Sequence, residues 1–494
     1  MTDPDRALPQ AVLRAATDRR LLDETIRRGR TTRAELAAET GYSRPTVSEA
    51  VRRMVAQGLL DASGLNETGR RGRVGTFYSL GARAGWVLGL EISQTGVRAR
   101  ATDLAGTILH EETNPPTSPG DVPELVASVR SLTRRMSVIS GTALATAPTP
   151  SATDPTTPPS TGSASPSAGP PPSSSGTTPP SAGASSPSAD GPLPSFSGAG
   201  SSSTSGASPS PSGAASPSTS GASRSASSAS PSPSGAAPHS ARGASPFSHP
   251  AGVSAGPSRA GFAAGRGPLR AIGISLANPV DPSTQAVVPL PGTPFPEGLL
   301  SPEHMLADLT DAPILVDNDV NLAALAEHRL GRAAGESSFA YVYLGAGIGV
   351  GLYLGHQLIR GAHGLAGEIG YLPGIVSPTL SGDLRAGGFD RKDAPAIDVN
   401  SILALLDRPS ETAVRQLAEA TSRAIVSVAA VVDPALFLLG GPVGTHPALL
   451  PAVRELMTFP GPPRIEHGAL GADAPLTGAL QLALEFARAA ATAP

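Results

Sequence analysis

Apolar residues recur at helical spacing in three short segments near the N-terminus, which predicts three helices. The apolar positions of the first segment are Leu21, Leu22 and Ile26. A capping box made of Thr32 and Glu35 begins the second helix, and Gly41 ends it. Ser43 is a suitable N-cap for the third helix. The core-facing positions of this helix are predicted to be Val47, Val51, Met54 and Val55.

Two β-prone runs, Leu59-Leu60 and Thr76–Tyr78, follow these helices and flank a tip rich in arginine and glycine. This order predicts a winged helix-turn-helix domain over residues 1–82. Its third helix would enter the major groove of double-stranded DNA, and the arginine-rich tip suits phosphates or the minor groove. The candidate DNA contacts are Ser43, Arg44, Thr46, Ser48, Arg52, Arg70, Arg71 and Arg73. A winged helix that binds another protein is the alternative interpretation.

Beyond residue 83, short apolar runs alternate with helical segments, which predicts an α/β body. The predicted strands are Trp86–Thr95, Val97–Gly106, Arg270–Leu276, the run from Ile314 to Asn321, Tyr341–Leu344 and Leu436–Leu439. The predicted helices are Pro123–Met136, Leu322–Leu330 and Glu411–Val432.

Residues 143–265 interrupt this body with an almost pure mixture of Ser, Pro, Ala, Gly and Thr. Such a composition cannot bury enough apolar surface to offset chain entropy, so we expect a long disordered insertion. The α/β pattern is already under way at residues 83–142 and resumes at residues 266–494. We therefore place the insertion in a loop of the body, where it serves as a passive spacer.

Charge is distributed unevenly along the chain. Residues 1–83 hold 15 Arg against 10 Asp and Glu, a net charge of +5, whereas the whole chain carries −3. A basic N-terminal domain on an acidic body is typical of a DNA-binding module joined to a second function. The absence of cysteine excludes disulfides, thiolate metal sites and cysteine nucleophiles. We find no signal peptide or membrane span, because Asp433-Pro434 breaks the most apolar C-terminal run, and we expect a cytoplasmic protein.

Candidate chemistry gathers in a glycine-rich stretch, Tyr341–Tyr371. Its glycines alternate over Gly345–Gly351, and a second cluster contains one carboxylate, Glu368. Dense glycines let the backbone approach a ligand and present N–H groups to an anion. A plain glycine-rich hairpin is the alternative. The polar run Asp317–Asn321 follows a predicted strand, at the position where α/β sites collect polar residues.

Three segments together resemble the ROK family of repressors, open reading frames and sugar kinases: Val316–Gly331, Leu344–Tyr371 and Val432–Gly441. The winged helix with its GRRGR tip resembles the repressor branch. The resemblance implies a two-lobed, actin-like ATPase fold with a sugar in its cleft. The residues that it assigns to the sugar are Asn318, Asp319, Glu368 and Tyr371, with Asp319 as the general base if the chain is a kinase.

The chain departs from the family pattern at both phosphate motifs and at the zinc site. Family kinases carry Asp-x-Gly-Gly-Thr at the first hairpin and Gly-Thr-Gly at the second. Here the same positions read Glu91–Thr95, without either glycine, and Gly345-Ala346-Gly347. The histidine of the family zinc site is replaced by Tyr371, and the cysteine ligands are missing. We therefore expect no catalytic residue, no cofactor and no metal.

These features lead to one main hypothesis. The chain would be a transcriptional repressor of carbohydrate metabolism, a dimer or tetramer that binds a palindromic operator. A sugar or sugar phosphate would act as its effector, without phosphoryl transfer. One alternative is an ATP-dependent sugar kinase with an attached DNA-binding domain. Another is a regulator that takes its signal from a partner protein through a vestigial cleft.

Overall fold

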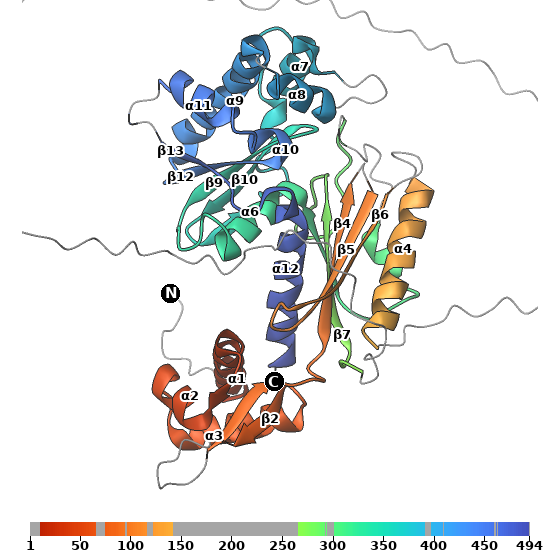
Figure 1. Cartoon of the computed structure of the whole chain (residues 1–494), viewed down its shortest axis with the longest axis vertical. Helices are drawn as coiled ribbons and strands as arrows, with labels where there is room; N and C mark the ends of the chain where they lie inside the picture. The colour runs from red at the N-terminus through yellow and green to blue at the C-terminus, as the bar shows by residue number, and fades with distance from the viewer. Residues whose placement is uncertain are drawn as a thin grey trace, which may run out of the picture. The chain divides into compact units, whose positions relative to one another are not determined.

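The computed structural model describes residues 10–65, 75–93, 96–115, 122–141, 265–291, 293, 301–390, 397–408, 410–458, 461 and 463–493 (Figure 1). The predicted insertion at 143–265 lies outside these ranges except for Gly265. Arg70, Arg71 and Arg73, proposed for the tip of the hairpin, also lie outside the described residues.

The first domain has the predicted order of helices and strands, with a three-stranded sheet β1-β3-β2. Its elements are α1 (Gln10–Arg28), β1 (Thr31–Thr32), α2 (Arg33–Thr40), α3 (Arg44–Ala56), β2 (Leu60–Leu65) and β3 (Thr76–Leu80). The capping box is confirmed, because Thr32 accepts from the Glu35 N–H and Glu35 accepts from the Thr32 N–H. Ser43 is confirmed as the N-cap of α3.

The core face of α3 was predicted correctly at three of four positions. Val47, Val51 and Met54 are fully buried, but Val55 is 38% exposed, so its assignment to the core was wrong. Val55 lies at the edge of the apolar stripe, and the small Ala50 takes the remaining place in the core. A helix has room for about 100° of buried stripe, which the other four side chains already fill.

The rest of the described chain is built around two five-stranded sheets, and their strands follow the same order relative to the sequence. The orders are β6-β5-β4-β7-β8 and β11-β10-β9-β12-β13. In each sheet the first three strands in sequence are antiparallel neighbours, and the last two join them in parallel. The strands of the first sheet are β4 (Trp86–Ser93), β5 (Gly96–Asp103), β6 (Ile108–Asn114), β7 (Leu269–Leu276) and β8 (Ile314–Asn318). This repeated topology confirms the two-lobed α/β fold.

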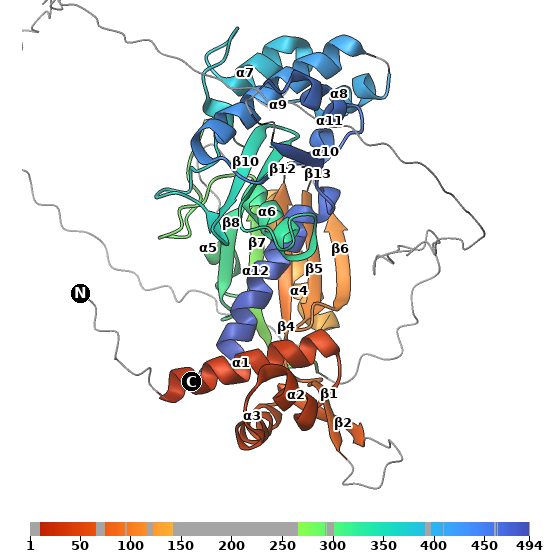
Figure 2. The ribbon, with the colours of Figure 1, turned by 90° about the vertical axis from the view of Figure 1, so that its left-hand side faces the viewer.

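Helices cover both faces of the first sheet. The long helix α4 (Val122–Ile139) packs an apolar face on one side, and α12 (Ala474–Ala491) lies against the other (Figures 1 and 2). Short α5 (Pro302–Leu306) lies beside α4. The predicted strand Arg270–Leu276 is confirmed as the buried β7.

The second lobe contains the glycine-rich stretch. Its strands are β9 (Phe339–Leu344), β10 (Ile348–Leu354), β11 (Gln357–Ile359), β12 (Leu436–Gly440) and β13 (Arg464–His467). Its helices are α6 (Asp319–Leu330), α7 (Leu380–Leu384), α8 (Val399–Leu406), α9 (Glu411–Val432), α10 (Gly441–Gly444) and α11 (Leu449–Leu456). Across all the described ranges, no helix combines the length and apolarity that a bilayer crossing requires.

The start of α6 differs from the prediction and affects the site directly. The sequence pattern placed the helix at Leu322–Leu330, but it begins at Asp319. Asn318 ends strand β8 and caps α6, so strand and helix meet without a loop. The polar residues expected to trail from a strand are therefore fixed at a helix N-terminus.

Helix α12 approaches its neighbours so closely that two glycines are required. A Cβ on Gly478 would lie 2.0 Å from the Leu322 carbonyl oxygen of α6, and one on Gly273 of β7 would lie 2.0 Å from the Ala479 carbonyl oxygen. Backbone atoms cannot move aside as flexible side-chain ends do. These contacts hold α12 between the first sheet and α6.

We predict that Gly478→Ala destabilises the protein, although Gly→Ala inside a helix ordinarily stabilises by about 1 kcal/mol. Here the added methyl group would overpack against α6, so we expect the free energy of unfolding to fall by about 1–3 kcal/mol instead of rising. Urea denaturation measures the change. Gly347→Ala is the control, because its added methyl meets open space. An increase in stability for Gly478→Ala would show that α12 and α6 are not in tight contact.

Candidate functional site

A cavity of about 190 Å³ brings together the sugar-binding residues predicted from the sequence. Its walls include Asn318, Asp319, Glu368 and Tyr371, together with Ala346 from the turn between β9 and β10. These residues come from the end of β8, the start of α6 and the glycine-rich stretch. The volume is below the roughly 300–1,000 Å³ of pockets for drug-sized ligands, so it suits one small polar molecule.

Two carboxylates give this cavity unusual electrostatics. Burial, together with the nearby charges of Glu91 and Glu368, raises the pKa of Asp319 to about 7. Burial raises the pKa of Glu368 to about 7 as well. Both side chains keep part of their surface accessible, because they line the cavity while protein replaces the bulk water around them. Near neutral pH each group can therefore either accept or donate a hydrogen bond.

Asn318 lies at the cavity, but the fold already uses most of its amide. Its Oδ1 accepts from the backbone N–H of Val320 and of Asn321, at 2.9 and 3.2 Å. Its Nδ2 donates to the Asn278 carbonyl oxygen at 3.2 Å. One amide N–H is left for a ligand, so the contribution of Asn318 is mainly to fix the start of α6 beside Asp319.

Tyr371 connects two sides of the cavity. It follows Glu368 in the short 3-10 turn Ile369–Tyr371, and its hydroxyl donates to the Pro291 carbonyl oxygen. Pro291 and Thr293 belong to the first lobe and also line the cavity. Burial first, and then the Glu368 charge, raise the pKa of the Tyr371 hydroxyl. Tyr371 thus closes the cavity wall with a hydrogen bond between segments 80 residues apart.

An ion pair that was not predicted from the sequence joins the two lobes. Arg360, just after β11, donates to Asp317 of β8 at 2.7 Å, and Asn321 donates to the same carboxylate at 3.2 Å. Asp317 is 2% exposed, and burial raises its pKa against the pull of Arg360. Asp317 stood in the predicted polar run, but the arginine partner is 43 residues away in the sequence.

The hairpin β4–β5, where the family's first phosphate motif lies, carries a cluster of ion pairs. Arg98 contacts Glu91 at 3.1 Å and also pairs with Asp473, the residue before α12. Arg100 pairs with Glu111 at 2.9 Å and with Asp473 at 3.2 Å. Burial raises the pKa of Glu91, against the effect of Arg98. The cations nearest this hairpin are thus bound to protein carboxylates.

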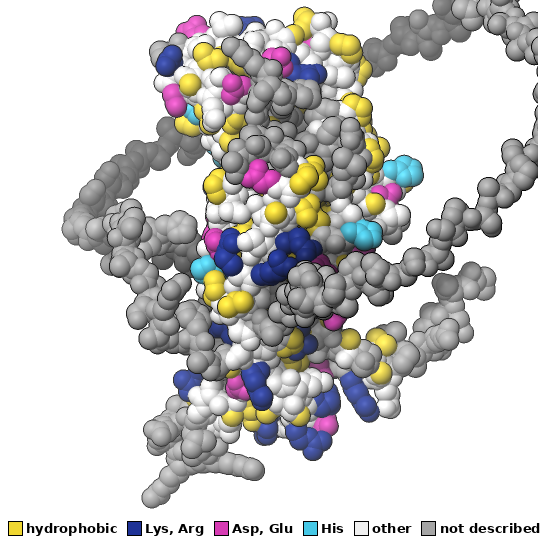
Figure 3. Space-filling view, turned by 90° about the vertical axis from the view of Figure 1, so that its right-hand side faces the viewer, with side chains coloured by type: hydrophobic (Ala, Val, Ile, Leu, Met, Phe, Trp, Pro, Cys, Tyr) yellow, Lys and Arg dark blue, Asp and Glu magenta, His cyan; other side chains and the backbone are white. Residues whose placement is uncertain are grey.

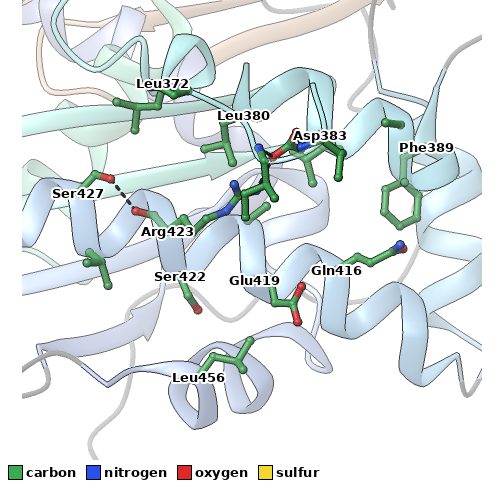
Figure 4. Close-up of a pocket in the computed structure, with 18 of the residues that line it drawn as sticks. Leu372, Leu380, Asp383, Phe389, Gln416, Glu419, Ser422, Arg423, Ser427 and Leu456 are labelled. Carbon is green, nitrogen blue, oxygen red and sulfur yellow. Dashed lines mark hydrogen bonds and ion pairs between the residues drawn. The ribbon is translucent and has the colours of Figure 1, made fainter. Parts of the chain in front are cut away.

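A larger cavity, of about 820 Å³, lies between α7, α9 and α11 (Figure 4). It is lined mainly by apolar side chains. Of its charged side chains, Asp383 and Arg423 pair with each other at 2.9 Å, and Glu419 pairs with Arg415. Asp383 also accepts hydrogen bonds from the N–H groups of Ile375, Val376 and Ser377. The smaller cavity has more polar groups facing a ligand, so we take it as the candidate site.

The loop after Tyr371 does not supply the zinc ligands that the resemblance implied. The chain has no cysteine, and within the described ranges no group of three His, Asp or Glu side chains could hold a metal ion. The three N–H groups bound to Asp383 fix the shape of this loop instead.

The outer face of α3 presents the predicted DNA contacts. Arg44, Thr46 and Arg52 are exposed, and Ser48 is half-buried. Arg52 pairs with Glu49 at 2.7 Å and remains 73% exposed, whereas Arg53 is held against α1 by Asp18 at 2.7 Å. Figure 3 shows dark-blue side chains at the winged-helix end of the described chain, and these are arginines, because the one lysine of the sequence, Lys392, lies outside the described residues. Ser43 is exposed, but its hydroxyl is used for capping.

Comparison with known proteins agrees with both parts of this description. A model for winged helix-turn-helix DNA-binding domains matches residues 14–61, and the ROK family model matches residues 264–379. The chain carries a ROK family domain behind a winged helix-turn-helix. The ROK domain and the winged helix together share their fold with a crystal structure of a ROK family transcriptional regulator, a homologue of E. coli Mlc. The TM-score is 0.55 at 13% identity, over 97% of this chain and 99% of that one.

Curated relatives of the ROK domain include both enzymes and a regulator. The bifunctional enzyme NanE/NanK of Brucella melitensis is 33% identical over 187 residues, 35% of this chain and 36% of that protein. A beta-glucoside kinase of Klebsiella pneumoniae is 30% identical over 191 residues, 35% of this chain and 64% of the kinase. A putative xylose repressor of Caldicellulosiruptor is 33% identical over 101 residues, 20% of this chain and 25% of the repressor. The chain thus spans about a third of the Brucella enzyme and a quarter of the repressor.

Proposed function

We propose that the chain is a transcriptional regulator, a repressor of carbohydrate genes, whose ROK domain binds a sugar and does not transfer phosphate. The proposal rests on one observation, which is that two features occur in the same chain. Asp319 and Glu368 line a cavity, and Arg44 and Arg52 lie on an exposed face of α3. Carboxylate and amide groups in one small cavity give a polyol the acceptors and donors that it needs. The protein would bind its operator as a dimer or tetramer.

Helix α12 gives the two sites a physical connection. Helix α6 begins at Asp319, and its Arg329 pairs with the Glu485 carboxylate of α12. The Glu485 backbone carbonyl in turn accepts from Arg19 of α1 at 3.1 Å. A sugar that shifts α6 would therefore move Glu485 relative to the winged helix. This coupling requires a different sugar affinity in the DNA-bound and free states.

The absence of phosphoryl transfer is supported by the first hairpin. A transferred phosphate must be positioned and its charge stabilised by nearby groups. Here Arg98 is paired with Glu91 and Asp473. Two carboxylates at this position would repel phosphate oxygens.

We expect a binding sugar to change the affinity of the full-length chain for DNA by about 5- to 150-fold, the usual range of allosteric coupling. The DNA is first selected from a random pool with the chain itself. Fluorescence anisotropy then measures its affinity with and without each member of a panel of hexoses and hexose phosphates. Sugar binding without any change in DNA affinity would contradict the regulatory role.

The same titration tests the proposed route through α12. Glu485→Gln should weaken the effect of sugar on DNA affinity while both separate affinities stay near those of the wild type. Glu419→Gln is the matched control, since Glu419 forms a similar exposed ion pair with Arg415 on α9. Equal loss of coupling in both variants would argue against α12 as the route.

The second candidate function is an ATP-dependent sugar kinase attached to a DNA-binding domain. Asp319 favours it, because an accessible carboxyl with a pKa of about 7 suits a general base at neutral pH. One of the relatives described above, from Klebsiella pneumoniae, is also named a kinase. An ATPase assay coupled to hexose addition separates the two functions. Sugar-dependent ADP release that disappears in Asp319→Asn would establish the kinase.

A further inference from the structure

The candidate cavity contains one cation that the sequence did not single out. Arg385 follows α7 and lines the same cavity as Asp319, Glu368 and Tyr371. It is half-buried, and it also borders a shallow hollow beside Asp390. Within the described part of the chain, no carboxylate lies within ion-pair distance of Arg385. This sets it apart from Arg98, Arg360 and Arg423, each of which is bound to an acid.

Arg385 and Tyr371 line the same cavity and lie close enough for their charges to interact. Its positive charge lowers the pKa of the Tyr371 hydroxyl, against burial and the Glu368 charge, which raise it. The hydroxyl of Tyr371 is occupied by Pro291, and Ser381 lies against Gly370 on the same wall. A ligand that reaches this end therefore meets a guanidinium and small polar groups.

We propose that the ligand of this cavity is an acidic monosaccharide whose anionic group binds Arg385. This inference rests on the proposed sugar-binding function and deepens it. A guanidinium presents paired donors that match a carboxylate or a phosphate, and such hydrogen bonds are about twice as strong as neutral ones. The hydroxyl groups of the same ligand would face Asp319 and Glu368. Because both acids have a pKa of about 7, part of their charge is neutralised near neutral pH, which reduces repulsion of an anion.

A neutral sugar would leave the charge of Arg385 without a partner inside the complex. Covering a half-buried cation with a ligand that cannot pair with it costs desolvation energy. The cavity should therefore discriminate against a neutral hexose in favour of its sugar acid or its phosphate. These two sources of negative charge share one chemistry, and the experiment distinguishes them.

The test is calorimetry on the full-length chain with matched ligands. Glucose, galactose, mannose and N-acetylglucosamine are each compared with their 6-phosphate, their 1-phosphate and the corresponding aldonic acid. At least one acidic member should bind ten or more times as tightly as its neutral parent. Arg385→Gln should abolish this preference while neutral binding persists, and Arg385→Lys should keep part of it. Arg415→Gln, an exposed arginine on α9, is the control and should change nothing.

Each outcome bears on a different statement. A preference for acidic ligands that survives Arg385→Gln overturns the assignment of Arg385. Tight binding of a neutral sugar without preference for its acid overturns the acidic ligand but leaves the sugar-binding proposal standing. Failure of every ligand, neutral and acidic, overturns both. Preference for phosphates alone, or for aldonic acids alone, identifies which anion Arg385 accepts.

Discussion

Replacing Arg44 and Arg52 together with Ala lowers the affinity of the full-length chain for its selected DNA by at least about tenfold, because each good base contact contributes about 1–3 kcal/mol. Both side chains lie on the exposed face of α3, at the position of a recognition helix. If either arginine contacts a phosphate instead, the slope of log affinity against log salt falls by about one per contact. Anisotropy titrations at several salt concentrations measure both quantities.

Arg415→Ala provides a matched control for Arg52. Both arginines are 73% exposed, and each forms an ion pair with a glutamate on its own helix. They differ in location, since Arg415 belongs to α9 of the ROK domain. Unchanged DNA affinity in the α3 double variant would show that this face does not bind DNA. It would favour the alternative in which the winged helix binds a protein.

Asp319→Asn lowers sugar affinity by about 10- to 100-fold, as expected when a charged hydrogen bond of about 1.5–3 kcal/mol is lost. The same change should raise the melting temperature at pH 8. Folding raises the pKa of Asp319 to about 7, above its ordinary value of 3.8, because the native state disfavours the charge. The native state then binds more protons than the unfolded state between these values, so stability falls as pH rises from about 4 to 7. The Asp319→Asn variant has no carboxyl at this position, so it should not lose this stability as the pH rises.

Thermal unfolding at pH 5 and pH 8 separates the two effects. The gain from Asp319→Asn should appear at pH 8 and shrink at pH 5, where the aspartic acid is already neutral. Asp311→Asn is the control, because Asp311 is an exposed carboxylate just before β8. A loss of stability at pH 8 would mean that the ionised carboxylate helps to hold the start of α6. Asp319 would then be a structural residue rather than one kept for a ligand.

Several features of the fold could be predicted because they depend on neighbours in the sequence. The capping box of Thr32 and Glu35 and the cap at Ser43 involve residues three apart, and the structure confirms both. The prediction that Val55 faces the core was wrong, because the spacing of apolar residues does not tell how wide the buried stripe of a helix will be. The predicted start of α6 at Leu322 was wrong, because Asn318 can either end a strand or cap a helix, and here it does both.

The candidate site was predicted only in part. Asp319 and Glu368 line one cavity, as the resemblance implied, although the sequence separates them by 49 positions. Arg385, which we propose as a ligand contact, was not predicted, because nothing near it in the sequence marks it out. Tyr371 lines the cavity, its hydroxyl donates to the Pro291 carbonyl oxygen, and its contact with a sugar stays a prediction.

Side chains a few residues apart were enough to predict the starts of α2 and α3, the apolar stretches and the basic domain, because these features are local. Which charges neutralise one another depends instead on contacts between distant segments of the folded chain. Arg98 meets Asp473 across 375 residues, and Arg360 meets Asp317 across 43. Such pairs depend on the order of strands in the two sheets and on the position of α12 between the first sheet and α6. Arg385, which has no acid within ion-pair distance among the described residues, cannot be distinguished from the other arginines until the chain is folded.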